Sequence, residues 1–146
     1  MMRYRETGPV HLDFHRTANG TMAYLRTQYG LEFLDGVLRR TAREVYRALH
    51  EDLRRGDPEH WLEHARYFLE REGGEYEIQR EGDVIRLIVR RCPARAYLRA
   101  RGIEPDPAFC RQTVVMNETW AEGTPFEITT EVLGEGRCCQ TLRRRP

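Results

Sequence analysis

The sequence predicts an α+β domain in which a helical N-terminal half packs on a mostly antiparallel four-stranded sheet. Apolar residues recur at helical spacing through the first half of the chain, and they alternate with a period of two in two later segments. A glycine-containing turn interrupts each alternating segment, as in a β-hairpin. Because no repeat or linker divides the 146 residues, we expect residues 1–146 to form a single domain.

Three helices are expected before the first hairpin, at residues 10–29, 31–53 and 58–72. Each shows an apolar stripe, and the longest carries arginines and acidic residues on its other face, as amphipathic helices do. The second helix should end at Gly56, which suits a left-handed C-cap, and Pro58 suits the first turn of the third.

The two hairpins are expected at residues 75–91 and 125–143. Two helices should lie between them, at residues 93–102 and 106–123. The second of these contains three consecutive β-branched residues, 113–115, so a strand is an alternative there. Helices packed on a sheet of two hairpins form a layered arrangement that buries the apolar surfaces of both.

The composition argues against several classes of function. All 24 basic residues are arginine, which excludes lysine Schiff-base chemistry, and they are interleaved with 23 acidic residues. We therefore expect no nucleic-acid partner. No apolar run approaches the roughly 20 residues that a membrane helix needs, so no membrane association is expected. The N-terminus lacks a signal-peptide core, and two of the four cysteines are adjacent, so we expect a reduced, cytoplasmic protein.

The segment HWLEH, residues 60–64, matches the H-x-x-E-H pattern of one group of zinc proteases. If Trp61 marks the buried stripe of its helix, His60 and Glu63 point away from the core and His64 lies at the edge. The pattern lacks a third ligand and a cleft-forming context. We therefore expect a solvent-exposed helix face here and no metal site.

A second histidine pair occurs in HLDFHR, residues 11–16. If the first helix extends back to His11, then His11 and His15 lie four residues apart near its apolar side. Such a pair can bind a metal or act as a base. The alternative is a pair of partly buried histidines whose ring nitrogens are satisfied by hydrogen bonds.

Two cysteines occur where helices are expected to begin. Cys92 follows a strand and precedes Pro93, so it should be an N-cap residue that faces unpaired backbone N–H groups. Cys110 should lie in the first turn of the helix capped by Asp106. The helix ends favour ionised thiols, as do three arginines near Cys92, which are Arg90, Arg91 and Arg95. We expect a lowered pKa at Cys92, although both thiols could equally be small buried hydrophobic groups.

The same thiols offer a zinc site as an alternative. Cys92, Cys110 and Cys138 could converge in the fold, with His15 or Cys139 as the fourth ligand. Zinc is the only cofactor that the sequence brings into consideration. The spacing is wide and contains no C-x-x-C knuckle, so the metal hypothesis depends on the tertiary structure.

A family resemblance follows from the segments RRCPARAYLRARG, FCRQ and GEGRCCQTLRR, together with HRTANGTMAYLRTQYG in the first half. Their layout resembles the L-2-amino-thiazoline-4-carboxylic acid hydrolase-like family over most of the chain. Members of that family often have Cys-Asp-Phe in the last strand, where this chain has Cys-Cys-Gln. The outline is also similar to 4-vinyl-reductase-type small-molecule-binding domains, whose cysteines hold zinc in some sensor proteins.

The resemblance implies a hydrolase that opens a small cyclic amidine or thiazoline carboxylate to give a carbamoyl-cysteine. Cys92 would be the nucleophile and His15 the acid and base, and Cys110 would lie on the side of the substrate anion. The substrate-binding candidates are Asn19, Arg90, Gln112 and Asn117. The alternative function is a binding module that holds a small molecule without turnover. In both cases the expected partner is a small molecule, and a homodimer is left open.

Overall fold

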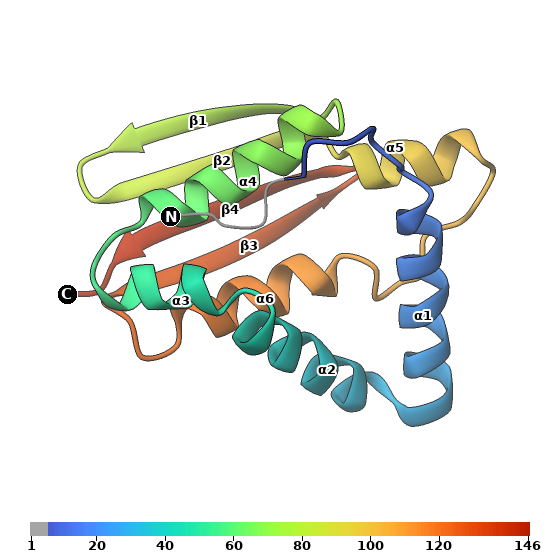
Figure 1. Cartoon of the computed structure of the whole chain (residues 1–146), viewed down its shortest axis with the longest axis horizontal. Helices are drawn as coiled ribbons and strands as arrows, with labels where there is room; N and C mark the ends of the chain where they lie inside the picture. Colours follow the sequence, from blue (N-terminus) through green and yellow to red (C-terminus); the bar gives the residue numbers. More distant parts are fainter. Residues whose placement is uncertain (1–5) are drawn as a thin grey trace.

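The computed structural model describes residues 6–146, which form an α+β fold with four helices before the first hairpin and two between the hairpins (Figure 1). The helices are α1 (Phe14–Tyr29), α2 (Leu31–Glu44), α3 (Arg47–Arg54), α4 (Glu59–Arg71), α5 (Pro93–Ala100) and α6 (Arg111–Ala121). The strands are β1 (Glu75–Glu81), β2 (Val84–Arg91), β3 (Phe126–Gly134) and β4 (Arg137–Arg144).

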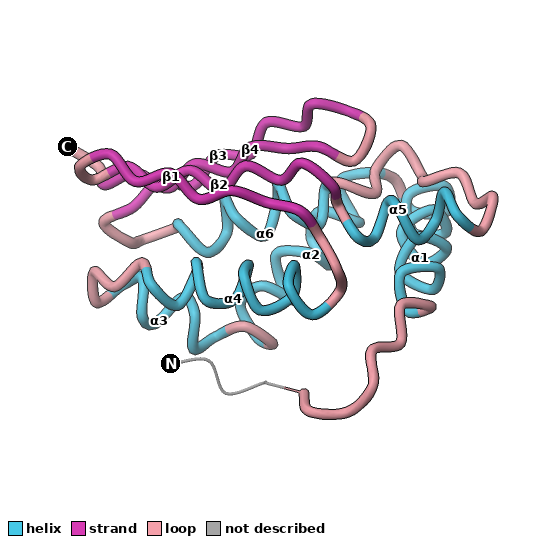
Figure 2. Tube along the Cα trace, turned by 90° about the horizontal axis from the view of Figure 1, so that it is seen from above, coloured by secondary structure: helices cyan, strands magenta, loops and turns pink. Residues whose placement is uncertain are grey.

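The strands form one antiparallel sheet in the order β1-β2-β4-β3, so the two hairpins pair through β2 and β4. Seen from above, α3, α4 and α6 lie beneath one face of this sheet, and α1 and α5 lie at one end (Figure 2). The expected fold class is confirmed. Among residues 6–146, no helix has both the length and the apolar character that crossing a membrane requires.

The helix boundaries correct the sequence expectations in three places. The first helix begins at Phe14 and not near residue 10, so His11 precedes it and is exposed. The expected helix over residues 31–53 is two helices, because the backbone leaves the helical region at Tyr46 (φ −105°, ψ 31°). The last helix begins at Arg111, after turns over residues 107–110.

The break at Tyr46 also changes the surroundings of the HWLEH segment, since it lets α3 pack along α4. His60 was expected to face solvent, but it is only 2 % exposed, and its Nδ1 lies 2.6 Å from Oδ2 of Asp52 on α3. The expectation of an exposed face was therefore wrong at His60. The spacing of apolar residues along α4 could not reveal that α3 covers the side of the helix on which His60 lies.

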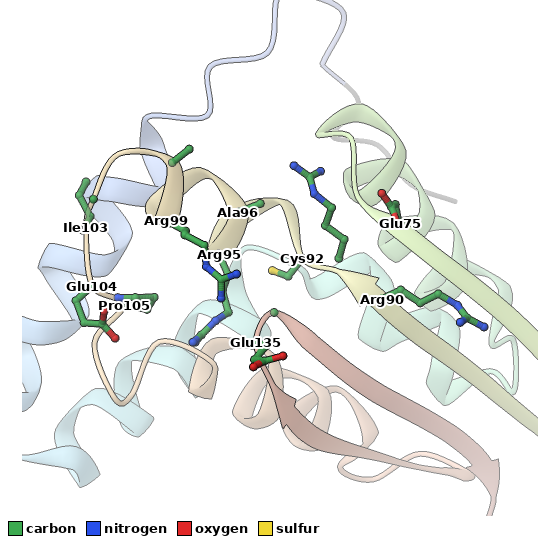
Figure 3. A pocket seen from close by; sticks show the side chains of 14 residues that line it. Glu75, Arg90, Cys92, Arg95, Ala96, Arg99, Ile103, Glu104, Pro105 and Glu135 are labelled. Carbon is green, nitrogen blue, oxygen red and sulfur yellow. The ribbon is translucent and has the colours of Figure 1, made fainter.

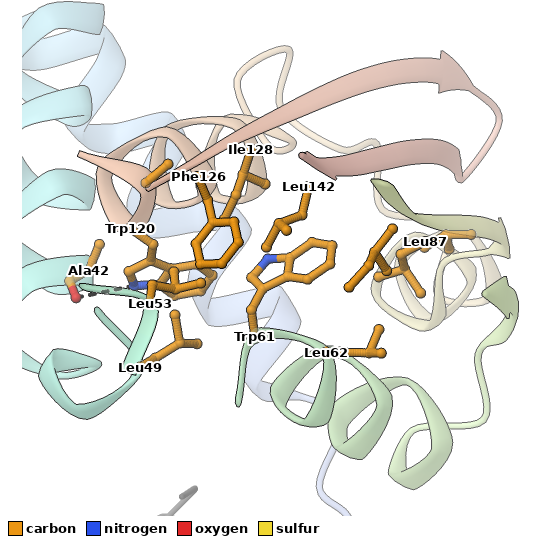
Figure 4. Close-up of a cluster of buried hydrophobic side chains, with 13 residues drawn as sticks. Ala42, Leu49, Leu53, Trp61, Leu62, Leu87, Trp120, Phe126, Ile128 and Leu142 are labelled. Carbon is orange, nitrogen blue, oxygen red and sulfur yellow. Dashed lines mark hydrogen bonds between the residues drawn. The ribbon is translucent and has the colours of Figure 1, made fainter. Parts of the chain in front are cut away.

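The core has two parts. The larger part fills the space between the sheet and α3, α4 and α6, where Trp120 donates a hydrogen bond to the carbonyl of Ala42 over 3.2 Å (Figure 4). The smaller part joins α1, α2, α5 and α6 around Leu34, Leu98 and Phe109. Cys92 packs against both parts. The end of β2 is therefore the point where the two apolar layers meet.

Strand alternation decides which side chains of the sheet face the helices. Directly paired residues of an antiparallel ladder point to the same face. Leu87 pairs with Gln140 and Val89 pairs with Cys138, and both β2 residues are buried against the helices. Cys138 and Gln140 consequently face the helices. Cys139 faces the opposite side of the sheet.

Candidate functional site

A cavity of about 350 Å³ lies between the helix-facing side of the sheet and the helices α4 and α6, with the starts of α1 and α5 at one end. Its volume is in the range of small-ligand sites. Most of its wall is apolar. The lining includes the rings of Phe14, Tyr46, Trp61, His64, Phe68, Phe109 and Trp120, the thiols of Cys92, Cys110 and Cys138, and the polar side chains of His15, Glu72, Gln112, Asn117, Thr130 and Gln140.

Cys92 occupies the N-cap position that the sequence predicts, with an extended backbone and with Pro93 in the first turn of α5. Its N–H donates to the carbonyl of Gly136 over 2.8 Å, which ties this helix start to the β3–β4 turn. Burial raises the pKa of the Cys92 thiol, and the N–H groups of Ala94 and Arg95 and the charge of Arg95 offset this only in part. The expected lowering of this pKa is therefore wrong, because desolvation outweighs the helix end.

The other two thiols of the cavity come from α6 and β4. Cys110 is the residue before α6, and Arg95 Nη1 donates to its Sγ over 3.6 Å. Cys138 follows from the sheet alternation described above, and burial raises its pKa to about 11. Cys92, Cys110 and Cys138 therefore line one cavity, as the sequence analysis anticipated for a convergent set.

This convergence does not produce a metal site. Within residues 6–146, no group of three or more His, Cys, Asp and Glu side chains is arranged to hold a metal ion. Cys139 cannot complete such a set with Cys138, because adjacent residues of a strand point to opposite faces. Its Sγ instead lies 3.9 Å from Oγ1 of Thr141. Zinc is therefore not part of the site that we describe.

A histidine–carboxylate pair lies at the α1 end of the cavity. His15 is buried, and its Nε2 lies 2.9 Å from Oε2 of Glu72, the residue that ends α4. Both side chains line the cavity. A carboxylate that binds one imidazole nitrogen fixes the orientation of the ring. An imidazole held in this way is the kind of group that can carry a proton inside a mostly apolar space.

Asn117 lies on the floor of the cavity, but its amide is fully used by the protein. Its Oδ1 accepts from Trp61 Nε1 over 3.0 Å, and its Nδ2 donates to Thr130 Oγ1 over 2.9 Å and to Gln140 Oε1 over 2.8 Å. It therefore joins α4, α6 and the sheet. A role in holding this wall fits Asn117 better than the predicted direct contact with a substrate. Gln112 also lines the cavity, so the structure leaves its predicted role open.

Two predicted binding residues lie outside this cavity. Asn19 is buried, and its side chain bonds the carbonyl of Glu104 over 3.3 Å and the N–H of Asp106 over 2.8 Å, so it holds the loop before α6. Arg90 forms an ion pair with Glu77 across the first hairpin. Arg90 lines a neighbouring groove and not the cavity.

The cavity also contains residues that sequence reasoning missed as functional groups. Glu72, Arg95 and Arg137 contribute the charged groups. His64 lies in a ring cluster, with centroid distances of 5.1 Å to Tyr46 and 5.3 Å to Trp120. Burial lowers the pKa of His64 to about 3, with a smaller effect of His60. The sequence held one usable signal for His64, its place at the edge of the apolar stripe of α4.

Comparison of the chain with models of protein families found no match, and comparison with curated proteins found no match either.

Proposed function

We propose that this protein is a hydrolase that opens a small cyclic amidine or thiazoline carboxylate within the cavity. The observation that carries the proposal is the common cavity itself. The Cys92 thiol, the His15–Glu72 pair and the Arg95 guanidinium all line it, although they come from three different parts of the chain, the start of α1, the end of α4 and the start of α5. A nucleophile, a proton carrier and a cation for a carboxylate are the groups that this reaction requires.

The raised pKa of Cys92 determines how the thiol would act. A thiol that stays protonated at neutral pH needs a base, so His15 would take its proton as the sulfur adds to the ring carbon between nitrogen and sulfur. The bond between that carbon and the ring sulfur would break, and His15 would give its proton to the ring sulfur, which becomes the thiol of the product. Water would then displace the Cys92 sulfur from the carbon, so that its oxygen becomes the carbamoyl oxygen and one of its protons returns to the Cys92 sulfur. Arg95 would hold the ring carboxylate during these steps.

Incubation with L-2-aminothiazoline-4-carboxylate tests the proposal, with loss of the ring and formation of carbamoyl-cysteine followed by chromatography. We expect turnover by the unmodified protein and none by Cys92→Ser. Cys139→Ser is the matched control, because Cys139 lies on the other face of the sheet, and it should retain full turnover. Absence of turnover by the unmodified protein, or full turnover by Cys92→Ser, would overturn the proposed reaction.

A non-catalytic binding module is the second candidate, and one observation favours it. Two thiols of the cavity have raised pKa values, and the wall is dominated by rings and aliphatic groups, as in a site that holds an uncharged ligand. Thermal stabilisation by phenols, together with no turnover of the thiazoline, would favour this function. A cytoplasmic location belongs to both proposals.

A further inference from the structure

A groove of about 730 Å³ lies beside the cavity and shares a wall with it. It runs between α5, the loop of residues 102–105 and the turn that joins β3 to β4 (Figure 3). Cys92, Arg95 and Gly136 line both the groove and the cavity. A ligand in the groove would therefore lie next to the same thiol, on the side away from the aromatic rings.

Four arginines line the groove, and they differ in their charged partners. Arg90 pairs with Glu77, and Arg91 donates to the carbonyl of Gly73 over 2.9 Å. Arg95 and Arg99, in contrast, form no ion pair with any of residues 6–146. They lie one helical turn apart on α5, so their guanidinium groups share one face of the helix. An anion bound between the two guanidinium groups would reduce their mutual repulsion.

Two carboxylates face the same space. In Figure 3 the side chains of Arg95 and Arg99 lie between Glu104 on one side and Glu135 on the other. Glu135 has a φ of 54°, in the left-handed region that favours glycine, so a full side chain is kept at this turn despite its conformational cost. Neither carboxylate forms an ion pair with any of residues 6–146. The groove thus presents cations and anions side by side.

We propose that this groove binds a free α-amino acid as its zwitterion. The ligand carboxylate would lie between Arg95 and Arg99 and accept hydrogen bonds from both, and its ammonium group would bind Glu104 or Glu135. A dianion such as phosphate would satisfy the arginines but would meet the two glutamates. The ligand side chain would point along the groove toward Cys92.

Titration with S-methyl-L-cysteine, followed by backbone amide chemical shifts, tests this inference, because this amino acid has no thiol that could form a disulfide. We expect saturable shifts in α5 and in the turn of residues 134–136. Arg99→Gln should weaken binding at least about tenfold, since it removes a charge-assisted hydrogen bond. Arg101→Gln is the matched control, because Arg101 lies two residues further on, stacks on Tyr97 and does not line the groove.

The ligand can be varied to test each charge separately. The N-acetyl derivative and the carboxamide of S-methyl-L-cysteine should both bind at least about tenfold more weakly than the parent amino acid. Glu104→Gln combined with Glu135→Gln should weaken the parent amino acid and leave the N-acetyl derivative unaffected. The inference is overturned by an absence of saturable shifts, by equal losses in Arg99→Gln and Arg101→Gln, or by phosphate or the N-acetyl derivative binding as tightly as the amino acid. Binding is measured without turnover, so the inference stands or fails independently of the proposed hydrolase.

Discussion

His15 Nε2 lies 2.9 Å from Glu72 Oε2, and this contact joins the start of α1 to the end of α4 across 57 residues of sequence. Both side chains are at least nine-tenths buried. Both side chains line the cavity, so this contact places an imidazole and a carboxylate within hydrogen-bond distance of each other there. It therefore gives the cavity a group that can move a proton.

Replacement of Glu72 by Gln should lower kcat of the proposed ring opening with little change in KM. The amide keeps the shape of the side chain but cannot stabilise a protonated His15 in the reaction. The free energy of unfolding should fall by about 1–2 kcal/mol, since a part-buried charged hydrogen bond is weakened. Steady-state kinetics and urea denaturation measure the two effects. Glu44→Gln alters an exposed i,i+4 ion pair with Arg40. This control should leave kcat unchanged and should change the free energy of unfolding by no more than about 0.5 kcal/mol.

The cysteines should differ in their alkylation by iodoacetamide as the pH is changed. With a pKa of about 11, only about a thousandth of Cys138 is thiolate at pH 8, and burial also keeps Cys92 mostly protonated. We expect both to react slowly at pH 7 and to accelerate steadily up to pH 10. Peptide mass spectrometry after limited labelling measures each site. Rapid labelling of Cys92 at pH 7, as the sequence alone would suggest, would contradict the desolvation that the structure shows.

His64 should make the fold less stable in mild acid. Its folded pKa of about 3 lies below the unfolded value near 6.5, so the unfolded chain binds a proton between these pH values and the folded chain does not. Stability from this group is therefore complete above about pH 7 and is lost as the pH falls toward 3. Between pH 7 and pH 4 the loss should be about 2–3 kcal/mol.

The contribution of His64 can be separated from that of the carboxylates with His64→Phe, whose ring suits the cluster of Tyr46, Phe68 and Trp120. Urea denaturation at pH 7 and pH 4 would give the stability change for each protein. The variant should lose about 2–3 kcal/mol less than the parent over this interval. An identical loss in both proteins would show that His64 is not the group responsible.

Asn117 should contribute more to the free energy of unfolding than Gln112, although sequence analysis named both as substrate-binding candidates. Asn117→Ala leaves Trp61 Nε1 without its acceptor in the buried wall, which should cost about 2–3 kcal/mol in the free energy of unfolding. Gln112→Ala is the control from the same helix, and it should change stability by less than about 1 kcal/mol. Denaturation of the two variants under one set of conditions gives the comparison. Equal losses would remove the distinction between the wall residue and the lining residue.

The layered fold could be predicted from the amino-acid sequence, because the patterns that specify its helices and strands are local. The change from helical spacing to alternation near residue 75 placed both hairpins, and Pro93 placed Cys92 at a helix start. Because side chains alternate along a strand, the sequence of β4 also implies that Cys138 and Cys139 face opposite sides of the sheet. The pairing of β4 with β2 then shows that Cys138 is the one that faces the helices. Sequence analysis named His15, Cys92, Cys110 and Cys138 as candidate catalytic or zinc-binding residues. The structure places all four around one cavity.

Properties that depend on burial and on contacts between distant segments became visible only in the three-dimensional structure. The low pKa expected at Cys92 followed from the helix end and nearby arginines, but the two core layers that meet there remove water and reverse the shift. The burial of His60 depends on a break at Tyr46 that no proline or glycine marks. Glu72 reaches His15 only because α4 ends beside α1. Desolvation and long-range pairing arise from packing, so no local pattern in the chain could specify them.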